Sequence, residues 1–421
     1  MQDKLLLMGV DSATRDAIAY AKQKGVYTIL TDCRPLDSCP ERRMADEQWT
    51  IDVVDLDALE AKCRSEQVTG VFAGNHELCL DMTKALCERL GLPFYATDEG
   101  WACTRDKLRF KQHCIDCGIA VPRRYELTPP FSREALDAVE YPVIVKPTDA
   151  CAQRGLSLCH NEQELLEAYE RALQFSASHT VLVEEWIDGT EISFDYLFLD
   201  GKPVRIALHH SVSIEVNQRR NFTLFLEPSV HCEPFDRQVG DKMEALFRSM
   251  NWTKGLVFIQ AICRDGIYYF LEMGGRLDGS GTWAVEKETM GESRLEYMVD
   301  LALGHPIRPT CDPVFNHYGK YSAFYLFWAR PGRIVRIEGE DAVRAMPGVN
   351  MILKRFHEGD EICETDNMLQ MAYYLAVVAD SREQLVQKIC DINRTLNLYD
   401  TAGNNLLLPF TEFEKLDEVY G

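Results

Sequence analysis

Short apolar runs alternate with amphipathic segments over the first hundred residues. The apolar runs predict buried strands at residues 5–8, 26–30 and 68–72. The amphipathic segments predict helices at residues 13–24, 56–64 and 78–90. This alternation is typical of an open parallel sheet flanked by helices, so we expect a Rossmann-like domain at residues 1–98.

The pattern changes along the rest of the chain. A helix is predicted at residues 104–117, and short strands and helices follow to about residue 304. Longer strands are then predicted at residues 334–337, 349–356 and 371–378, before a helix at residues 383–396. We expect a second domain at residues 99–310 and a small α+β domain at residues 311–421, so the fold class combines α/β and α+β parts.

Composition indicates a soluble globular protein with two or three domains. The 421 residues are 46% hydrophobic and 26% charged, and the apolar runs are too short to span a membrane. The N-terminal residues lead straight into a predicted strand rather than a signal peptide. Fifteen cysteines without a signal sequence indicate reduced thiols, and we expect a cytoplasmic protein. Cys114 and Cys117 have the spacing of a metal or redox pair, but helix packing is the simpler interpretation.

Charge and motifs exclude several kinds of partner. The formal net charge of −21 argues against nucleic acid, because phosphate contacts need a basic surface. The first predicted strand ends in Gly9-Val10-Asp11-Ser12, which is not a dinucleotide fingerprint, and the sequence has no P-loop motif. A dinucleotide oxidoreductase is therefore disfavoured. Gly74-Asn75 follows another strand and fits a structural turn better than a ligand site.

Two segments in the middle of the chain carry candidate nucleotide contacts. In the first, a predicted buried strand ends at Lys146 and is followed by a polar turn. The Lys146 ammonium could contact phosphate oxygens there. Taken alone, a lysine that reaches solvent is the simpler explanation. In the second, a strand edge at Glu184 and Glu185 could offer backbone groups to an adenine ring, and Glu191 could accept ribose hydroxyls. An ordinary hairpin with a solvated acid fits that segment equally well.

A third segment carries a candidate metal site. Asp265-Gly266 predicts a hairpin turn between two strands. Gln260 and Glu272 are twelve residues apart, so regular strands would place them opposite each other on one face. An amide oxygen and a carboxylate suit Mg²⁺ that is also bound by nucleotide phosphates. A hairpin with an exposed acid is the alternative.

Together, the order and spacing of the three segments resemble the ATP-grasp superfamily, in the branch shared by carbamoyl-phosphate synthetase, biotin carboxylase, D-alanine ligase and the L-amino-acid ligases. The resemblance covers essentially the whole chain. It implies a Rossmann-like N-terminal domain, a two-lobed ATP-grasp domain with a mobile lobe at about residues 122–184, and a smaller C-terminal domain. It also implies ATP and Mg²⁺, with Mn²⁺ as a substitute, as cofactors.

The resemblance implies roles for individual residues. Lys107 and Lys146 resemble the basic residues that contact the ATP phosphates. Gln260 and Glu272 resemble the magnesium ligands, and Arg276 resembles the arginine that steadies the reacting carboxylate or acyl phosphate. Nucleoside contacts are implied for the adenine-binding strand and hinge and for the ribose-binding acid: Glu184, Glu185, Ile187 and Glu191.

The chain departs from the family pattern at two places. Gly274 replaces the asparagine that commonly adds a metal contact in Glu-x-Asn-x-Arg. The phosphate-covering loop, Thr148 to Gly155, is poor in glycine, and Arg154 could compensate by donating to phosphate. A nucleotide-binding protein with a degenerate site therefore stays open as an alternative.

The resemblance implies a ligase that activates a carboxylate as an acyl phosphate and joins it to an amine, releasing ADP and phosphate. Its partners would be small-molecule carboxylate and amine substrates, without nucleic acid or membrane, and a homodimer is common in the family. A bicarbonate-dependent carboxylase is the alternative enzyme. Arg330 and His357 are weak candidates for the substrate pocket. A basic stretch could face the substrate or form a solvated loop: His209, His210, Arg219 and Arg220.

Overall fold

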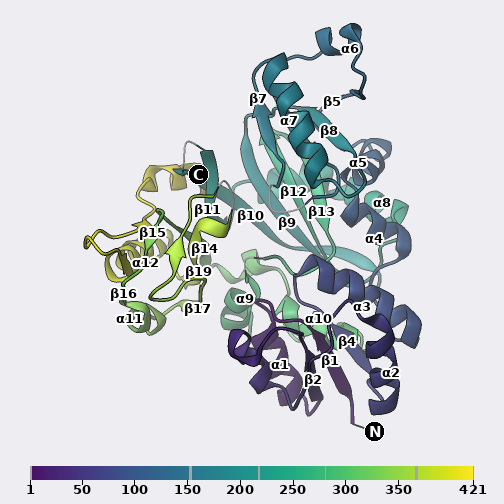
Figure 1. Ribbon diagram of the computed structural model, residues 1–421, viewed down its shortest axis with the longest axis vertical. Helices are drawn as coiled ribbons and strands as arrows, with labels where there is room; N and C mark the ends of the chain where they lie inside the picture. The colour runs from purple at the N-terminus through teal and green to yellow at the C-terminus, as the bar shows by residue number, and fades with distance from the viewer. Residues whose placement is uncertain (1, 151–153, 217–218, 280, 366–367, 421) are drawn as a thin grey trace.

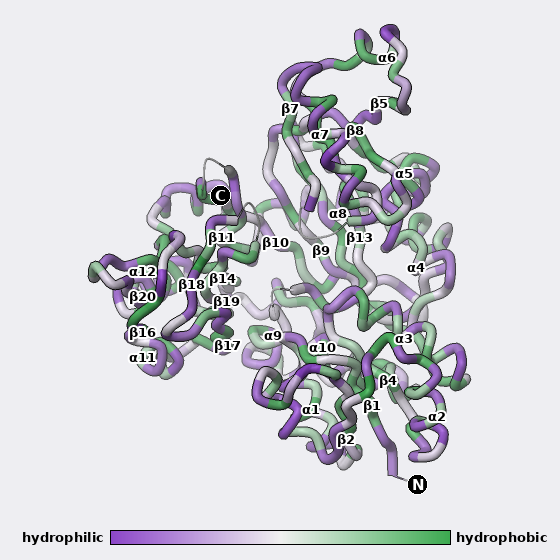
Figure 2. The backbone as a smooth tube through the Cα atoms, in the orientation of Figure 1, coloured by the Kyte–Doolittle hydropathy of each residue, from purple (hydrophilic) through white to green (hydrophobic). Residues whose placement is uncertain are grey.

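A computed structural model of the chain describes residues 2–150, 154–216, 219–279, 281–365 and 368–420 (Figure 1). The N-terminal residues form a block at one end, a small lobe stands at the other end, and the C-terminal residues lie to one side. Hydrophobic positions recur along the strands and hydrophilic positions on the outer helices and turns (Figure 2). In the part of the chain that is described, no helix is both long and apolar enough to cross a bilayer.

The N-terminal sheet is parallel and has the strand order β3-β2-β1-β4. Its strands are β1 (Lys4–Met8), β2 (Tyr27–Thr31), β3 (Glu47–Trp49) and β4 (Gly70–Phe72). The helices beside it are α1 (Thr14–Gln23), α2 (Leu56–Glu66) and α3 (Glu77–Leu90). The strands and helices predicted here are confirmed, and β3 is an addition.

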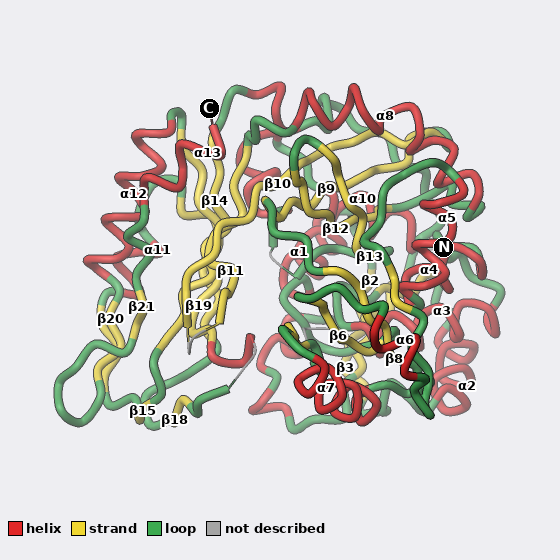
Figure 3. The backbone as a smooth tube through the Cα atoms, turned by 90° about the horizontal axis from the view of Figure 1, so that it is seen from above, coloured by secondary structure: helices red, strands yellow, loops and turns green. Residues whose placement is uncertain are grey.

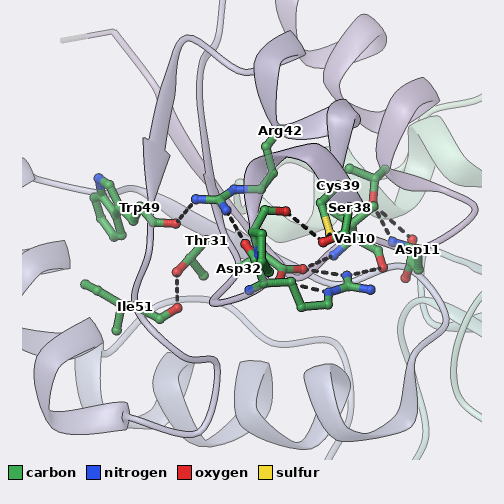
Figure 4. A network of polar contacts seen from close by, with 12 residues as sticks. Val10, Asp11, Thr31, Asp32, Ser38, Cys39, Arg42, Trp49 and Ile51 are labelled. Atoms are coloured by element: carbon green, nitrogen blue, oxygen red, sulfur yellow. Dashed lines mark hydrogen bonds and ion pairs between the residues drawn. The ribbon is translucent and has the colours of Figure 1, made fainter.

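Side chains at the carboxyl edge of this sheet bind one another (Figure 4). Asp32, just beyond β2, accepts hydrogen bonds from the Val10 amide at 3.1 Å and from the Arg34 guanidinium at 2.6 Å. Arg42 is buried and donates to the Trp49 carbonyl at 2.9 Å. In dinucleotide-binding sheets an acid in this region binds ribose. Here Arg34 engages that carboxylate, which agrees with the missing fingerprint.

The small lobe is an antiparallel sheet with the order β5-β8-β6-β7. Its elements are β5 (Arg124–Tyr125), α6 (Arg133–Asp137), β6 (Val143–Pro147), β7 (Ser157–Cys159), α7 (Glu162–Phe175) and β8 (Val181–Glu185). Val143 and Val145 on β6 share a buried cluster with Leu165 and Ala168 on α7. Because side chains alternate along a strand, Lys146 points away from α7.

Among the described residues, nine strands form the large sheet, in the order β13-β12-β9-β10-β11-β14-β19-β17 with β21 paired to β14. They are β9 (Thr190–Leu199), β10 (Lys202–Val216), β11 (Arg219–Glu227), β12 (Leu256–Arg264), β13 (Ile267–Gly274), β14 (Tyr321–Ala329), β17 (Val349–Lys354), β19 (Met371–Ala379) and β21 (Leu407–Leu408). Seen from above, the strands from β9 to β19 form one continuous curved surface (Figure 3). Strands after residue 311 therefore extend the same sheet, and the boundaries 1–98, 99–310 and 311–421 stay a proposal.

Helices and short strands complete the fold. The helices are α8 (Cys232–Ser249), α9 (Trp283–Met290), α10 (Arg294–Ala302), α11 (Glu340–Arg344), α12 (Arg382–Thr395) and α13 (Leu416–Tyr420). The short strands are β15 (Gly332–Arg333), β16 (Arg336–Glu338), β18 (Glu361–Ile362) and β20 (Asn397–Tyr399). Helix α8 packs against β10, and α12 packs against β14 and β19.

Two predicted elements are wrong in extent. The helix expected at residues 104–117 is divided into α4 (Asp98–Arg105) and α5 (Lys107–Asp116). The reason is Asp106, whose carboxylate accepts hydrogen bonds from the amides of Leu108 and Arg109 and so caps a new helix. Of the strand expected at residues 334–337, only the last two residues lie in a strand, β16, while β15 ends before residue 334; the two short strands are separate because they pair with different strands, β20 and β18.

A buried charged network joins the large sheet to α9 and α10. The Arg294 guanidinium, 1% exposed, lies 2.6 Å from the Asp195 carboxylate on β9 and donates to Glu286 on α9 at 2.6 Å. His209 on β10 lies 3.1 Å from Asp195 and 3.6 Å from Glu227 on β11. Burial lowers the pKa of His209, but Glu227 and Asp195 outweigh burial and raise this pKa to about 9. His209 is therefore charged at neutral pH.

Replacing Arg294 by methionine should destabilise the protein strongly. The substitution preserves volume but leaves Asp195 and Glu286 buried without their cation, a loss of about 3–5 kcal/mol in the free energy of unfolding. Urea unfolding followed by circular dichroism measures the change. The control is Arg248→Met on α8, where the pair with Glu244 is exposed and contributes at most about 1 kcal/mol. Equal stability of the two variants would contradict the role of the network.

Candidate active site

Lys107 links the two lobes at the predicted phosphate site. It is the first residue of α5, a helix that packs against β13. Its Nζ atom lies 3.0 Å from the Glu272 carboxylate on the large sheet and donates to the Ala150 carbonyl of the small lobe at 2.9 Å. A residue predicted to bind phosphate thus contacts a residue predicted to bind metal.

Lys146 and Glu184 form a second pair within the small lobe. Lys146 lies near the end of β6, and its Nζ atom is 3.0 Å from the Glu184 carboxylate on the neighbouring β8. Both side chains are buried. Burial raises the pKa of the Glu184 carboxyl, but Lys146 and Lys111 outweigh burial, so this pKa is lowered and the group stays ionised.

Lys111 is a site residue that the sequence reasoning missed. It is buried on α5 and contacts the Glu184 carboxylate at short range. Burial lowers its pKa to about 8, and the charge of Lys146 acts in the same direction while Glu184 opposes it. Its spacing of four residues from Lys107 was the available signal, because such residues share one face of a helix.

Gln260 and Glu272 are direct partners in the hairpin, as predicted, but not for the predicted reason. From the turn, Arg264 pairs with Ile267 and Ala261 with Phe270, a register that would not place Gln260 opposite Glu272. A β-bulge at Leu271 shifts the register by one residue and brings them together. Bulges of this kind re-aim side chains and are common near active sites.

The predicted cations and oxygen ligands converge on one place. Burial raises the pKa of Glu272, but the charges of Lys107 and then Lys146 outweigh burial, so this pKa is lowered. Both cations are therefore near enough to stabilise the ionised carboxylate. The amide of Gln260 and the carboxylate of Glu272 are oxygen donors of the kind that Mg²⁺ prefers.

Glu191 shares this face of the large sheet. On β9, Ser193 pairs with Gln260 and Glu191 pairs with Ile262, so Glu191 and Ser193 point to the same side. Burial raises the pKa of Glu191 to about 7, and the charge of Arg220 opposes the shift. The predicted ribose acid therefore changes its protonation near neutral pH.

The adenine and loop predictions are only partly described. Ile187 is buried just beyond β8, and the Glu185 amide donates to the Arg123 carbonyl at 2.9 Å as part of the sheet edge. Arg154 is exposed in a turn. Residues 151–153 of the covering loop lie outside the described residues.

Arg276 is anchored from several sides. Its Nε donates to the Glu77 carboxylate at 2.6 Å, and its Nη1 donates to the Leu277 carbonyl at 2.9 Å. Its guanidinium lies over the Phe258 ring, 4.9 Å from the centroid. Sequence reasoning missed Glu77, which is 199 positions away in the chain.

Phe258 also explains the missing asparagine. A Cβ atom at Gly274 would lie 2.2 Å from the Phe258 ring, so no side chain fits there. The metal contact that asparagine commonly supplies therefore cannot come from this position. The ring that excludes it supports Arg276 instead.

Several alternative candidates do not belong to this site. His209 belongs to the buried network described above, and His210 is also buried, so the basic stretch is not a solvated loop but long strands β10 and β11. His357 is exposed and lies 3.7 Å from Asp360. Cys114 lies on α5 and is buried in the core, as helix packing predicts. The side chain of Arg219 lies outside the described residues.

Family models match two parts of the chain. That of the D-ala D-ala ligase C-terminus matches residues 121–217, and that of the L-amino acid ligase C-terminal domain 2 matches residues 324–398. An L-amino acid ligase from Bacillus licheniformis has a similar structure, with a TM-score of 0.79 at 14% identity over 95% of this chain and 99% of that one. The chain has the fold of the ATP-grasp ligases. The predicted resemblance and fold class are confirmed.

Curated relatives extend the ATP-grasp match over nearly the whole chain. A carbamoyl phosphate synthase large chain, C-terminal section, from Aquifex aeolicus is 24% identical over 96% of this chain and 75% of its own. Dapdiamide A synthase from Enterobacter agglomerans is 22% identical over 84% of this chain and 87% of its own. Of the full-length carbamoyl phosphate synthase large chains that it matches, the chain spans 24–28%.

A further ATP-grasp neighbour was solved with ligands. The biotin carboxylase domain of Hydrogenobacter thermophilus 2-oxoglutarate carboxylase, in complex with MgADP and bicarbonate, superposes with a TM-score of 0.76 at 19% identity, over 96% of this chain and 91% of that one. That neighbour therefore binds nucleotide with magnesium.

Replacing Gly274 by asparagine should not restore the usual ATP-grasp metal contact. The new side chain would collide with Phe258 and displace Arg276, and overpacking of this kind costs about 1–3 kcal/mol. Thermal unfolding measures the loss. Gly279→Ala is the control, because a Cβ atom there meets open space. Unchanged stability with tighter Mg²⁺ binding would contradict the steric explanation.

Nucleotide affinity should depend on pH through Glu191. A carboxylate accepts ribose hydroxyls best when ionised, and below pH 7 the free protein holds this group protonated. Affinity should therefore rise with pH, by about tenfold from pH 6 to pH 8 if only the ionised form binds. Calorimetric titration with ATP in parental protein and in Glu191→Gln separates this effect from titration of ATP itself. The same pH dependence in both proteins would contradict the ribose assignment.

Proposed function

We propose that the chain is an ADP-forming carboxylate–amine ligase with small-molecule substrates. The observation that carries the proposal is the convergence of Lys107 and Lys146 with the oxygen pair of Gln260 and Glu272, beside an anchored Arg276. Both matched family models are named for ligases, and dapdiamide A synthase aligns along most of its length.

The cations suit a phosphoryl transfer. A substrate carboxylate oxygen attacks the ATP γ-phosphorus, the bond to the β–γ bridging oxygen breaks, and ADP leaves. Such a reaction depends on positioning and charge stabilisation rather than covalent help from the protein. Lys107 and Lys146 offset charge on the transferring group, and Gln260 and Glu272 would hold Mg²⁺, which neutralises phosphate charge when bound.

The second step joins the substrates. The amine nitrogen attacks the acyl carbon, the carbon–oxygen bond to phosphate breaks, and the amine proton passes to solvent. Arg276 steadies the acyl phosphate through charge-assisted hydrogen bonds, which contribute about 1.5–3 kcal/mol each. An acyl phosphate is lost if water reaches it, so we expect the lobe at residues 122–184 to close during turnover.

The free protein keeps these charges neutralised internally. Lys107 is paired with Glu272, and Lys146 is paired with Glu184. Binding of metal at Glu272 would release Lys107 to the phosphates, so we expect metal and nucleotide to bind together. The positive charge of Lys107 is then available to the nucleotide phosphates. In this way a chain with a formal net charge of −21 can attract a polyanion.

A bicarbonate-dependent carboxylase is the second candidate, and the match to the biotin carboxylase domain supports it. A screen of ADP release against amino acids, small carboxylates and bicarbonate separates the two. Release that needs both a carboxylate and an amine supports the ligase. Release with bicarbonate and no added carboxylate supports the carboxylase, and nucleotide binding without any release supports a degenerate site.

Lys146→Ala and Glu272→Ala should nearly abolish ADP formation while the protein stays folded. Each removes a charge from the transfer site, and losing one such contact costs on the order of 10²–10³ in rate. The measurement is coupled ADP release with the acceptor identified by the screen. Lys202→Ala, at the exposed first residue of β10, is the matched control. Turnover at the parental rate in either site variant would show that the assignments are wrong.

A further inference from the structure

The loop that carries Arg276 is held by the N-terminal domain. The Tyr95 hydroxyl donates to the Gly275 carbonyl at 2.6 Å, and the Asn75 amide group donates to the Asp278 carbonyl at 3.3 Å. Further along, the Trp283 indole donates to a carboxylate on α1 at 2.9 Å. The side-chain pair of Glu77 with Arg276 lies among these contacts, so the N-terminal domain fixes this segment of the ATP-grasp domain at several points.

Glu77 lies between two arginines from different parts of the site. It is the first residue of α3, and its Oε1 accepts from Arg276 Nε at 2.6 Å. Its other oxygen contacts Arg105 at short range. Arg105 ends α4, two residues before Lys107. The Glu77 carboxylate therefore connects Arg276, proposed to lie at the acyl group, with the segment that leads to Lys107.

Partial burial makes this pairing effective. The side chains of Arg276 and Glu77 are 17% and 29% exposed, so water screens their attraction less than it screens an open surface pair. With Nε bonded to Glu77, Nη1 bonded to Leu277 and the plane stacked on Phe258, the guanidinium has a fixed orientation.

Asp81 offers a control that distinguishes the orientation of Arg276 by Glu77 from contacts that only hold the domains together. It lies one turn after Glu77 on the same face of α3 and accepts from Arg105 at 2.9 Å and from the Trp101 indole at 2.9 Å. Asp81 thus shares Arg105 with Glu77, whereas Arg276 pairs with Glu77. If Glu77 only held the domains together, replacing Glu77 or Asp81 should affect activity in the same way.

We propose that Glu77 is a positioning residue, supplied by the N-terminal domain, that holds the Arg276 guanidinium where it meets the reacting carboxylate. The inference rests on the proposed ligase function for its kinetic consequence. The N-terminal domain then belongs to the catalytic unit, because its Glu77 carboxylate orients the Arg276 guanidinium at the acyl group.

Kinetics on the full chain test the proposal. Glu77→Gln keeps the shape but loses the charge, and kcat should fall about 10- to 100-fold, the cost of a misplacement of about 1 Å. The KM for ATP should stay within about twofold of the parental value, because the nucleotide contacts are elsewhere. Glu77→Asp should recover part of the loss, and Asp81→Asn should retain most activity. A parental kcat in Glu77→Gln, or an equal loss in Asp81→Asn, would overturn the proposal.

Chemical labelling gives an answer that does not depend on turnover. Phenylglyoxal modifies accessible arginines, and peptide mass spectrometry reports the rate at Arg276. This rate should rise several-fold in Glu77→Gln and stay parental in Asp81→Asn. Labelling at the parental rate in Glu77→Gln would refute the pairing even if the parental protein released no ADP. Failure of the parental protein in the ADP screen, with faster labelling in Glu77→Gln, would instead reject the ligase function and keep the positioning contact.

Discussion

Pairing between lysines and carboxylates is the interaction on which the site depends. Lys107 contacts the large sheet at Glu272 and the small lobe at Ala150, while Lys146 neutralises Glu184 inside the small lobe. Because these side chains are buried or partly buried, their charges attract each other more strongly than those of surface pairs do. The pairs hold each group in place, where it can exchange its internal partner for phosphate or metal.

Irregular backbone features give this site its geometry. The bulge at Leu271 turns Glu272 toward Gln260, and the cap at Asp106 begins a new helix with Lys107 as its first residue. Gly274 lets the chain pass against Phe258, whose ring then supports Arg276. The regular sheets hold these features at fixed positions, and the buried network around Arg294 ties the large sheet to the helices that follow Arg276 in the chain.

Much of the fold could be predicted because its signals are local. The first hundred residues showed their strands and helices through periodicity, and the three motif segments identified the family through order and spacing. The continuation of the large sheet into β14, β19 and β17 was not predictable, because strand pairing joins residues far apart in the chain. The break at Asp106 was missed because the apolar pattern continues through it.

The site was predictable where a motif marks a residue and not where only a tertiary contact does. Lys146, Glu272 and Arg276 belong to recognisable segments. Only its spacing of four residues from Lys107 marks Lys111, and nothing in the sequence near Glu77 indicates its pairing with Arg276. The sequence also gives no sign of the bulge that shifts the hairpin register, because its extra residue, Leu271, is of an ordinary type for a strand.

Transfer of oxygen from substrate to phosphate tests the central claim most directly. If the carboxylate is activated as an acyl phosphate, one of its oxygens must leave with the phosphate. A carboxylate labelled with oxygen-18 should therefore yield inorganic phosphate that carries one labelled oxygen per amide bond formed, as measured by mass spectrometry. Unlabelled phosphate released during product formation would contradict the account.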